Sequence, residues 1–239
     1  QRNCGGGDDL THTLYHSGLS CDIRAALIEL IQKDRLTNLF AAGFSMGGNL
    51  VLKMAGEFGK ATPSEIIGFI AVAPALNLAA CADALAEPRN FIYQQHFVWR
   101  LKARIQKKAL LFPKVYKLDG LHKIRTVREY DNALTAPHSG FRDASDYYAR
   151  ASANQFLASI ARPTLILAAE DDPFVPFISI ANAVQSASPY LELVSTRYGG
   201  HCAFISSCRE ERFWSEARIV EFCERVAKSR SDPMVHSST

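Results

Sequence analysis

A short apolar run leads into a glycine-flanked serine in the stretch Asn38-Leu39-Phe40-Ala41-Ala42-Gly43-Phe44-Ser45-Met46-Gly47-Gly48-Asn49-Leu50. A strand is predicted over residues 36–42, and the apolar spacing after Ser45 predicts a helix. A Gly-x-Ser-x-Gly sequence at such a junction is typical of a sharp, strained turn in which small residues let the two arms pass closely. The turn exposes the hydroxyl, and the first N–H groups of the helix are available to an oxyanion. Ser45 is therefore the predicted nucleophile of a hydrolase.

Composition excludes several classes of protein. With 239 residues and 48% apolar content, the chain can bury the core of one large α/β domain with an insertion. The net charge of +3 is too small to indicate a nucleic-acid partner. Six cysteines without a Cys-x-x-Cys pair predict reduced thiols in a cytoplasmic protein. No apolar run approaches the ~18 residues of a membrane span, and we expect no metal and no organic cofactor.

Further strands are predicted at residues 66–73, 164–169 and 191–194. The first two of these runs are apolar throughout, as is typical of parallel strands covered on both faces. A helix with its N-cap among residues 20–22 is predicted to run to residue 31. A final helix is predicted over residues 210–227, with Phe213 and Val220 among the side chains that cover one face of the sheet.

Between residues 77 and 161 the pattern changes to successive helices, including a long basic amphipathic segment at 91–108. An insertion of this size between two strands is best interpreted as a cap over the site. The predicted organisation is a first part of the core with the serine turn, a helical cap, a second part of the core, and a flexible tail. These segments are residues 1–76, 77–161, 162–228 and 229–239.

A serine nucleophile needs a base within hydrogen-bond reach and an acid that orients the base, and both follow it in the order acid, then histidine. After the predicted strand at 164–169 comes Glu170-Asp171-Asp172-Pro173-Phe174-Val175-Pro176, and after that at 191–194 comes Tyr198-Gly199-Gly200-His201. His201 is the predicted base and Asp172 the predicted acid, with the adjacent Asp171 left open as an alternative. The remaining histidines are predicted to be surface or locally satisfied residues: His12, His16, His96, His122, His138 and His236.

Motifs outside the serine turn indicate which family of proteins the sequence resembles. They are Arg2-Asn3-Cys4-Gly5-Gly6, Tyr15-His16-Ser17-Gly18-Leu19-Ser20-Cys21-Asp22, Arg128-Glu129-Tyr130-Asp131, Gly140-Phe141-Arg142-Asp143-Ala144-Ser145-Asp146-Tyr147-Tyr148, Asp171-Asp172-Pro173-Phe174 and Gly199-Gly200-His201. With Gly43-Phe44-Ser45-Met46-Gly47-Gly48-Asn49, they resemble the α/β-hydrolase superfamily and, within it, the YheT-type hydrolases, whose plant relatives are called embryogenesis-associated. The resemblance extends from Arg2 to about Trp214, and several motifs lie in the cap and in loops.

The resemblance implies a mostly parallel sheet flanked by helices, and hydrolysis of carboxylic esters, including lipid-like ones. It implies Ser45 as nucleophile, His201 as general base and then acid, Asp172 as the residue that orients it, and the Met46 backbone N–H as one oxyanion donor. Relatives carry an earlier His-Gly loop with a second oxyanion donor, preceded by several strands. Neither occurs in these 239 residues, so we expect the first strands of the fold to be missing here.

Two classes of function stay open at this point. The first is a serine hydrolase that cleaves a small-molecule acyl ester through an acyl-enzyme intermediate. The second is a non-catalytic α/β-hydrolase fragment that acts as a binding or structural module, because the upstream oxyanion loop is absent. Loss of one oxyanion donor typically costs about 10²- to 10³-fold in rate, which is why the second class is retained.

Basic residues dominate between positions 89 and 128, where eleven lysines and arginines stand against one acid, Asp119. A basic cap over an ester-cleaving site could rest on anionic lipid headgroups, which would make the protein peripheral to a membrane. A solvated helical face balanced by acids elsewhere would produce the same charge pattern. Both interpretations stay open.

Overall fold

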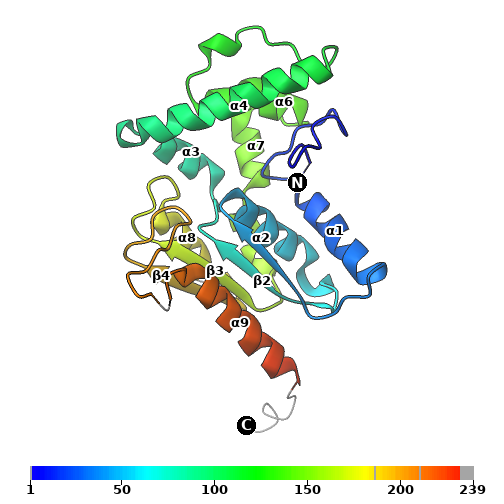
Figure 1. Ribbon diagram of the computed structural model, residues 1–239, viewed down its shortest axis with the longest axis vertical. Coiled ribbons are helices and arrows are strands. Elements are labelled where there is room, and N and C mark those ends of the chain that lie inside the picture. The colour runs from blue at the N-terminus through cyan, green and yellow to red at the C-terminus, as the bar shows by residue number, and fades with distance from the viewer. Residues whose placement is uncertain (1, 186, 210, 232–239) are drawn as a thin grey trace.

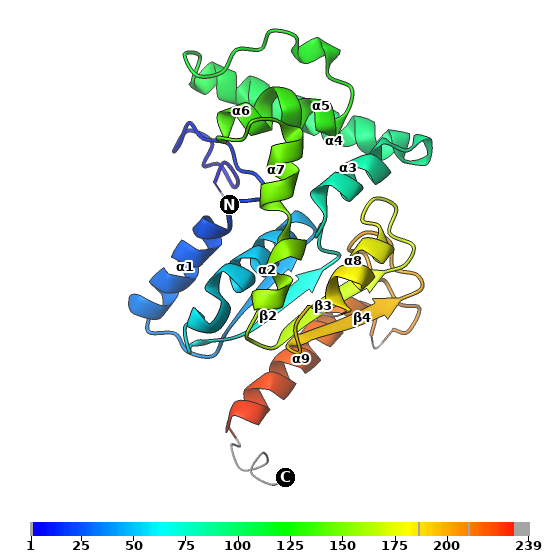
Figure 2. The same cartoon turned by 180° about the vertical axis from the view of Figure 1, so that it is seen from behind.

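The computed structural model describes residues 2–185, 187–209 and 211–231. Figures 1 and 2 show two parts stacked along the long axis, a sheet flanked by helices and a group of helices above it. The N-terminal loop, residues 2–19, lies beside this upper group, which we call the cap. The sheet and the helices that flank it form the core.

Four parallel strands form the sheet in the order β1-β2-β3-β4, so that each connection leads to the neighbouring strand. They are β1 (Leu39–Phe44), β2 (Ile66–Val72), β3 (Thr164–Ala169) and β4 (Leu191–Thr196). Every residue of β2 and β3 is buried, as expected of parallel strands covered on both faces. All four predicted strands are confirmed in their place in the chain, but their bounds differ. Strand β1 begins three residues later and ends two residues later than predicted, β2 ends one residue earlier, and β4 ends two residues later.

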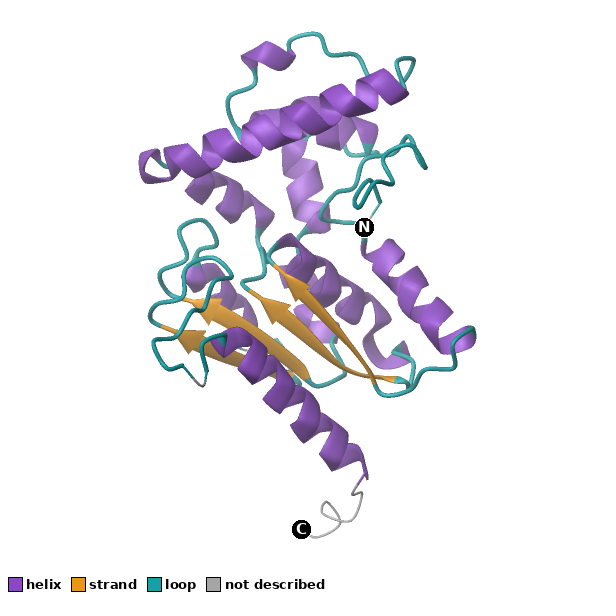
Figure 3. Cartoon of the chain, viewed as in Figure 1, coloured by secondary structure: helices purple, strands orange, loops and turns teal. Residues whose placement is uncertain are grey.

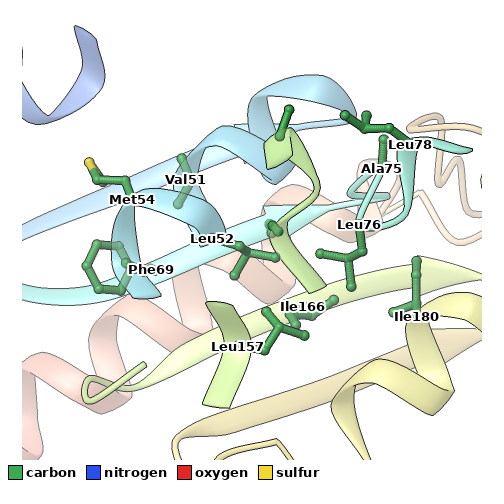
Figure 4. Packing of buried hydrophobic residues seen from close by; sticks show 14 of the residues in the cluster. Val51, Leu52, Met54, Phe69, Ala75, Leu76, Leu78, Leu157, Ile166 and Ile180 are labelled. Carbon is green, nitrogen blue, oxygen red and sulfur yellow. The ribbon is translucent and has the colours of Figure 1, made fainter. Parts of the chain in front are cut away.

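Helices cover both faces of the sheet (Figure 3). On one side lie α1 (Ser20–Gln32), α2 (Met46–Phe58) and α8 (Phe177–Val184), with the short η1 (Gly59–Ala61) after α2, and on the other lies α9 (Trp214–Ser231). Because side chains alternate along a strand, each strand serves both layers. On β3, Ile166 packs in the cluster on the α2 side, whereas Leu165 and Leu167 pack in the cluster that contains Phe222 of α9. Figure 4 shows the first cluster, including Ile166.

Two details of the predicted helices are wrong. Helix α1 begins at Ser20 with Leu19 as its N-cap and no side-chain cap, and the Ser20 hydroxyl instead donates to Glu57 at 2.5 Å. Helix α9 begins at Trp214, and Phe213 lies before it in an isolated bridge with Ile205.

The inner face of α9 is formed by Phe222 and Val226, while Phe213 and Val220 are exposed. Residues 211–213, which the apolar periodicity had assigned to the helix, therefore belong to the loop before α9. The helix continues to Ser231. Residue 210, where this helix was predicted to begin, lies outside the described residues. Residues 232–239, the remainder of the predicted tail, also lie outside them.

The cap consists of short and long helices between β2 and β3. They are α3 (Leu78–Ala86), η2 (Pro88–Asn90), α4 (Phe91–Leu111), η3 (Leu121–Lys123), α5 (Val127–Tyr130), the π-helix η4 (Asp131–Thr135), α6 (Ala136–His138), α7 (Ala144–Ala151) and η5 (Ala153–Ser159). The cap has an apolar cluster of its own, in which Val98 and Ile105 of α4 pack with Leu14 of the N-terminal loop and with Tyr130. The N-terminal loop is therefore part of the packing of the cap.

The basic residues of the cap do not form one free surface. Lys108 is buried and donates to backbone carbonyls of the N-terminal loop, and Lys107 pairs with Asp8 of that loop at 2.5 Å. Arg128 pairs with Asp83 of α3. Acids from outside the segment thus compensate part of its charge. Among the described residues, no helix is both long and apolar enough to cross a membrane.

Candidate active site

Ser45 lies at the turn between β1 and α2, where the chain passes from strand into helix. Its φ of 52° and ψ of −119° form a conformation that residues with a side chain rarely adopt. The Ser45 backbone N–H donates to the carbonyl oxygen of Val72 on β2 at 2.8 Å, which fixes the turn to the neighbouring strand. The strained turn expected from the sequence is present.

The two glycines of the Gly-x-Ser-x-Gly motif have unequal steric roles. A Cβ on Gly43 would lie 2.2 Å from the carbonyl oxygen of Gly47, a distance that the backbone cannot accommodate. A Cβ on Gly47 would meet no atom within 4 Å. The expectation that both positions must be small is therefore correct for Gly43 and wrong for Gly47, whose backbone, rather than its missing side chain, makes the close approach.

Three of the predicted site residues meet above the carboxyl ends of the strands. Ser45 Oγ lies 2.8 Å from His201 Nε2, and His201 Nδ1 lies 2.8 Å from Asp172 Oδ2. The three side chains follow β1, β4 and β3, and a parallel sheet brings the ends of these strands to one edge. The side chains of Asp172 and His201 are 2% and 17% exposed, so the contact between them is sheltered from water.

The two adjacent carboxylates have different partners. Asp172 contacts the imidazole, and its second oxygen accepts from two backbone N–H groups of the turn that follows it, at 3.1 and 2.9 Å. Asp171 Oδ1 accepts from the backbone N–H groups of Gly199 and Gly200 at 2.9 and 2.8 Å. Asp172 therefore touches the histidine ring, and Asp171 holds the loop that carries the ring.

The surroundings of His201 favour its charged form. Burial lowers the pKa of the imidazole, but the hydrogen bond and negative charge of Asp172, with a smaller contribution from Cys202, outweigh it and raise the pKa to about 9. A protonated imidazole has no lone pair with which to accept the Ser45 proton. The neutral form that could do so therefore becomes abundant only at alkaline pH.

The Met46 backbone N–H is available to a ligand. Met46 is the first residue of α2, and its N–H has no hydrogen-bond acceptor among the described residues. The first N–H groups of a helix lack intrahelical partners and form the positive end of its dipole. Met46 and Ser45 line the same cavity, so this N–H lies in the same site as the serine hydroxyl.

A cavity of about 330 Å³ opens beside Ser45, with walls from both the core and the cap. Much of its lining is apolar, including Leu78, Val127 and Phe174. A mostly apolar wall with a few polar groups is typical of sites for small molecules. The polar or charged side chains in the wall include His16, Arg104, Asp131, Thr135, Tyr147 and Tyr148.

His16 lies in this wall, a position that the sequence analysis missed. Its ring packs edge-on against Phe141 and Tyr147, with centroids 5.2 and 5.8 Å away, and its Nδ1 accepts from the Gly18 N–H at 3.1 Å. Burial and the nearby Arg2 lower the pKa of His16 to about 4, so the ring is neutral at physiological pH. The available signal was its motif, Tyr15 to Asp22, which matched the family outside the serine turn.

Asn49 is a second residue that the sequence analysis left without a role. Its buried side chain donates to the backbone carbonyls of Ser17 and Ala151, each at 2.9 Å, and accepts from the Ala153 N–H at 2.8 Å. Asn49 thus joins α2, which begins at the serine turn, to the N-terminal loop and to the end of the cap.

The described residues contain no group of three His, Cys, Asp or Glu side chains that could hold a metal ion. All six cysteines are free thiols in the structure.

Comparison with known proteins agrees with this architecture. Residues 1–207 match the family described as alpha/beta hydrolase fold. The Escherichia coli (strain K12) protein YheT, named as a candidate esterase, is 31% identical over 233 residues, which make up 96% of this chain and 68% of YheT. A Mus musculus protein named phospholipase ABHD3 is 31% identical over 235 residues, which make up 98% of this chain and 55% of that protein.

Among solved structures, the esterase Pf2001 of Pyrococcus furiosus has a TM-score of 0.52 at 15% identity, over 91% of this chain and 65% of that one. Identity this low supports the fold alone. The chain spans between about half and two thirds of the length of these relatives. From the family match and the similarity to YheT, the chain belongs to the α/β-hydrolase fold family and, within it, to the YheT-type hydrolases.

Proposed function

We propose that the protein is a serine hydrolase that cleaves carboxylic esters of small, lipid-like molecules through an acyl-enzyme intermediate. The observation that carries this proposal is the hydrogen-bonded series from Ser45 Oγ through His201 to Asp172, with the serine on a strained turn. The names of the relatives, an esterase and a phospholipase, support an ester substrate. The apolar part of the cavity wall suits an acyl chain.

In the first half-reaction, Ser45 Oγ attacks the carbonyl carbon of the ester while its proton passes to His201 Nε2. Asp172 accepts the hydrogen bond from Nδ1–H and stabilises the imidazolium that forms. The carbonyl oxygen becomes an oxyanion and accepts a hydrogen bond from the Met46 N–H. When the tetrahedral intermediate collapses, the bond to the alcohol oxygen breaks, that oxygen takes the proton from His201, and an acyl-serine remains.

In the second half-reaction, water attacks the acyl-serine and gives a proton to His201 Nε2. The second tetrahedral intermediate uses the same Met46 N–H. Its collapse breaks the bond to Ser45 Oγ, which takes the proton back from His201, and the carboxylic acid leaves. One water is consumed, and the side chains return to their starting states.

A fluorophosphonate probe, which reacts with activated serines, tests the proposal directly. We expect the native chain to be labelled and to hydrolyse p-nitrophenyl esters, with a chain-length profile from acetate to palmitate that separates an esterase from a lipase. Ser45→Ala and His201→Ala should abolish labelling. The matched control is Ser145→Ala, which removes an exposed serine of the cap and should leave labelling unchanged.

The opposite result would favour the second function class. A folded native chain that takes no label and hydrolyses none of the esters contradicts a serine hydrolase and supports a non-catalytic binding or structural module. Labelling that persists in Ser45→Ala would mean that a different serine reacts. Circular dichroism of each variant separates loss of the nucleophile from loss of the fold.

Contact of the cap with an anionic membrane surface is a second candidate role. Helix α4 exposes Ile92 and Trp99 at 81% and 62%, and Arg100 is also exposed on this helix. Exposed apolar side chains beside basic ones are typical of helices that lie at a lipid surface. The competing interpretation is a solvated helical face, which the ion pair of Lys107 with Asp8 favours.

Vesicle flotation distinguishes the two interpretations. Membrane contact predicts binding that increases with anionic lipid and decreases with salt, and that Ile92→Glu combined with Trp99→Glu weakens. Ile178→Glu is the matched control, because Ile178 is 65% exposed on α8 of the core. Equal binding to neutral and anionic vesicles, or no binding, would favour the solvated face.

A further inference from the structure

A buried carboxylate that takes no part in the Ser45 hydrogen-bond series lies in the wall of the same cavity. Asp131, at the start of η4, is 8% exposed. Its Oδ2 accepts from the Tyr148 hydroxyl at 2.7 Å. Asp131 forms no ion pair within the described part of the chain, and the nearby Arg128 is paired with Asp83.

A buried carboxylate that forms no ion pair lowers the stability of the fold. Buried charges in proteins are normally paired with an opposite charge. Burial raises the pKa of Asp131 to about 6, although Thr135, the Tyr148 hydroxyl and the positive charge of Arg128 act in the other direction. At neutral pH the group is therefore mostly an anion, and Arg128 forms its ion pair with Asp83 rather than with it. Groups of this kind concentrate at functional sites.

Two family motifs that the catalytic series does not use meet at this carboxylate. Asp131 ends the motif that begins at Arg128, and Tyr148 ends the motif that begins at Gly140. Arg128 also lies over the ring of Tyr148, 5.0 Å from its centroid. Asp131 itself opens a π-helical turn, a rare form that occurs frequently at functional sites.

The neighbours of Asp131 are buried residues that line the same cavity. Tyr130, Thr135, Tyr147 and Tyr148 all line the cavity together with Ser45. If the hydrogen bond between Tyr148 and Asp131 served only to join α7 to η4, two neutral side chains could form it. A charged group in the cavity wall would then not be needed. The carboxylate is therefore placed to meet a ligand.

We propose that Asp131 is a specificity-determining residue that accepts a hydrogen bond from a donor group of the ester substrate, a hydroxyl or an ammonium. This role rests on the ester hydrolysis proposed above and adds a polar requirement to it. An ionised carboxylate has about four acceptor positions, and the Tyr148 hydroxyl occupies one of them. The remaining positions accept the substrate group, while the apolar part of the wall holds the acyl chain.

Matched esters test this role. Glycerol monodecanoate is compared with its di-O-methyl ether, which keeps the oxygen atoms but has no donor. Dimethylaminoethyl decanoate, whose ammonium group donates at neutral pH, is compared with isopentyl decanoate, which has nearly the same shape. We expect the native chain to prefer the donor-bearing member of at least one pair by about 10- to 100-fold in kcat/KM, as for a hydrogen bond to a charged group.

Variants of the carboxylate should remove this preference. Asp131→Asn should reduce the ratio within the pair, and Asp131→Leu combined with Tyr148→Phe should bring it close to one. The double variant replaces both hydrogen-bond partners by apolar groups of similar shape, which limits damage to the fold. Asp119→Asn, in an exposed part of the cap, is the control and should leave the ratio unchanged.

The ratio separates recognition from a structural role. If Asp131 only supports the fold, both members of a pair lose activity equally, and the inference is overturned. Absence of any preference in the native chain also overturns it. A preference confined to the glycerol pair identifies a hydroxyl, and one confined to the amino pair identifies an ammonium.

A binding measurement keeps this inference separate from the proposed function. If none of the esters is hydrolysed, the hydrolase proposal fails, and calorimetry with the four corresponding decyl ethers decides the role of Asp131. Binding of a donor-bearing ether about 10-fold tighter than its partner, lost in Asp131→Asn, supports recognition by the carboxylate. Equal binding of both members of each pair overturns it.

Discussion

The elevated pKa of His201 predicts a steep dependence of catalysis on pH. The pKa is about 9 because the hydrogen bond and charge of Asp172 outweigh burial. The base must be neutral to accept the Ser45 proton, and the neutral fraction is about 1% at pH 7 and about half at pH 9. The value of kcat/KM should therefore rise by roughly 50-fold between pH 7 and pH 9 and level off above that.

The assay is hydrolysis of p-nitrophenyl butyrate at constant ionic strength, read at a wavelength where both forms of the product absorb equally. The same measurement with Ser45→Ala supplies the background, which grows with hydroxide concentration. Asp172→Asn supplies a second profile, because loss of the negative charge should move its midpoint to lower pH as well as lowering the plateau.

A histidine with the ordinary pKa of about 6.5 would give a rise of only about 1.3-fold over the same interval. A native profile that is flat from pH 7 to pH 9, with its acid limb near pH 6.5, would therefore refute the inference that Asp172 holds His201 in its charged form. The ordinary pKa of His201 would then need another explanation despite the contact with Asp172, for example that water reaches the imidazole.

Three further tests, made with five variants, concern other parts of the site. Asp172→Asn should lower kcat by about 10⁴-fold and Asp171→Asn much less, because only Asp172 contacts the imidazole; equal losses would contradict this division. Gly43→Ala should lower the free energy of unfolding by about 3 kcal/mol or more, whereas Gly47→Ala should raise it by up to ~1 kcal/mol, as denaturant titration can measure. The raised pKa of Asp131 means that the unfolded chain ionises first as pH rises, so this carboxylate should cost the native fold about 2 kcal/mol between pH 4 and pH 7. The measurement is the difference in the free energy of unfolding between the native chain and Asp131→Asn at each pH, in which the contributions of other titrating groups such as His16 cancel; a difference that does not change with pH would contradict the raised pKa.

The parts of this fold that the sequence predicted are those governed by local chemistry. The runs of β2 and β3 are apolar on both faces and short, a pattern typical of covered parallel strands. The turn at Ser45 is likewise specified within a few residues, because Gly43 permits the contact with Gly47 that the turn requires. Such features need no knowledge of distant contacts.

Other features depend on which segments meet, and the sequence pattern does not contain that information. Asp171 and Asp172 differ only in the direction of their side chains at one turn, so spacing alone could not separate their partners. Lys108 looks like a surface charge within its helix, but it is buried against a loop about a hundred residues earlier. Asp131 acquires its position in the cavity wall only when η4 packs near α7.

The loop that carries His201 explains why two carboxylates follow β3. Its backbone is strained, with positive φ angles at Cys202 and Phe204 as well as at Gly200, and such conformations persist only where surrounding contacts enforce them. Asp171 supplies two of those contacts through the Gly199 and Gly200 N–H groups. Asp172 could orient the ring only if the loop were already in place. The two carboxylates therefore act in series, with Asp171 setting the position of the loop and Asp172 the orientation of the ring.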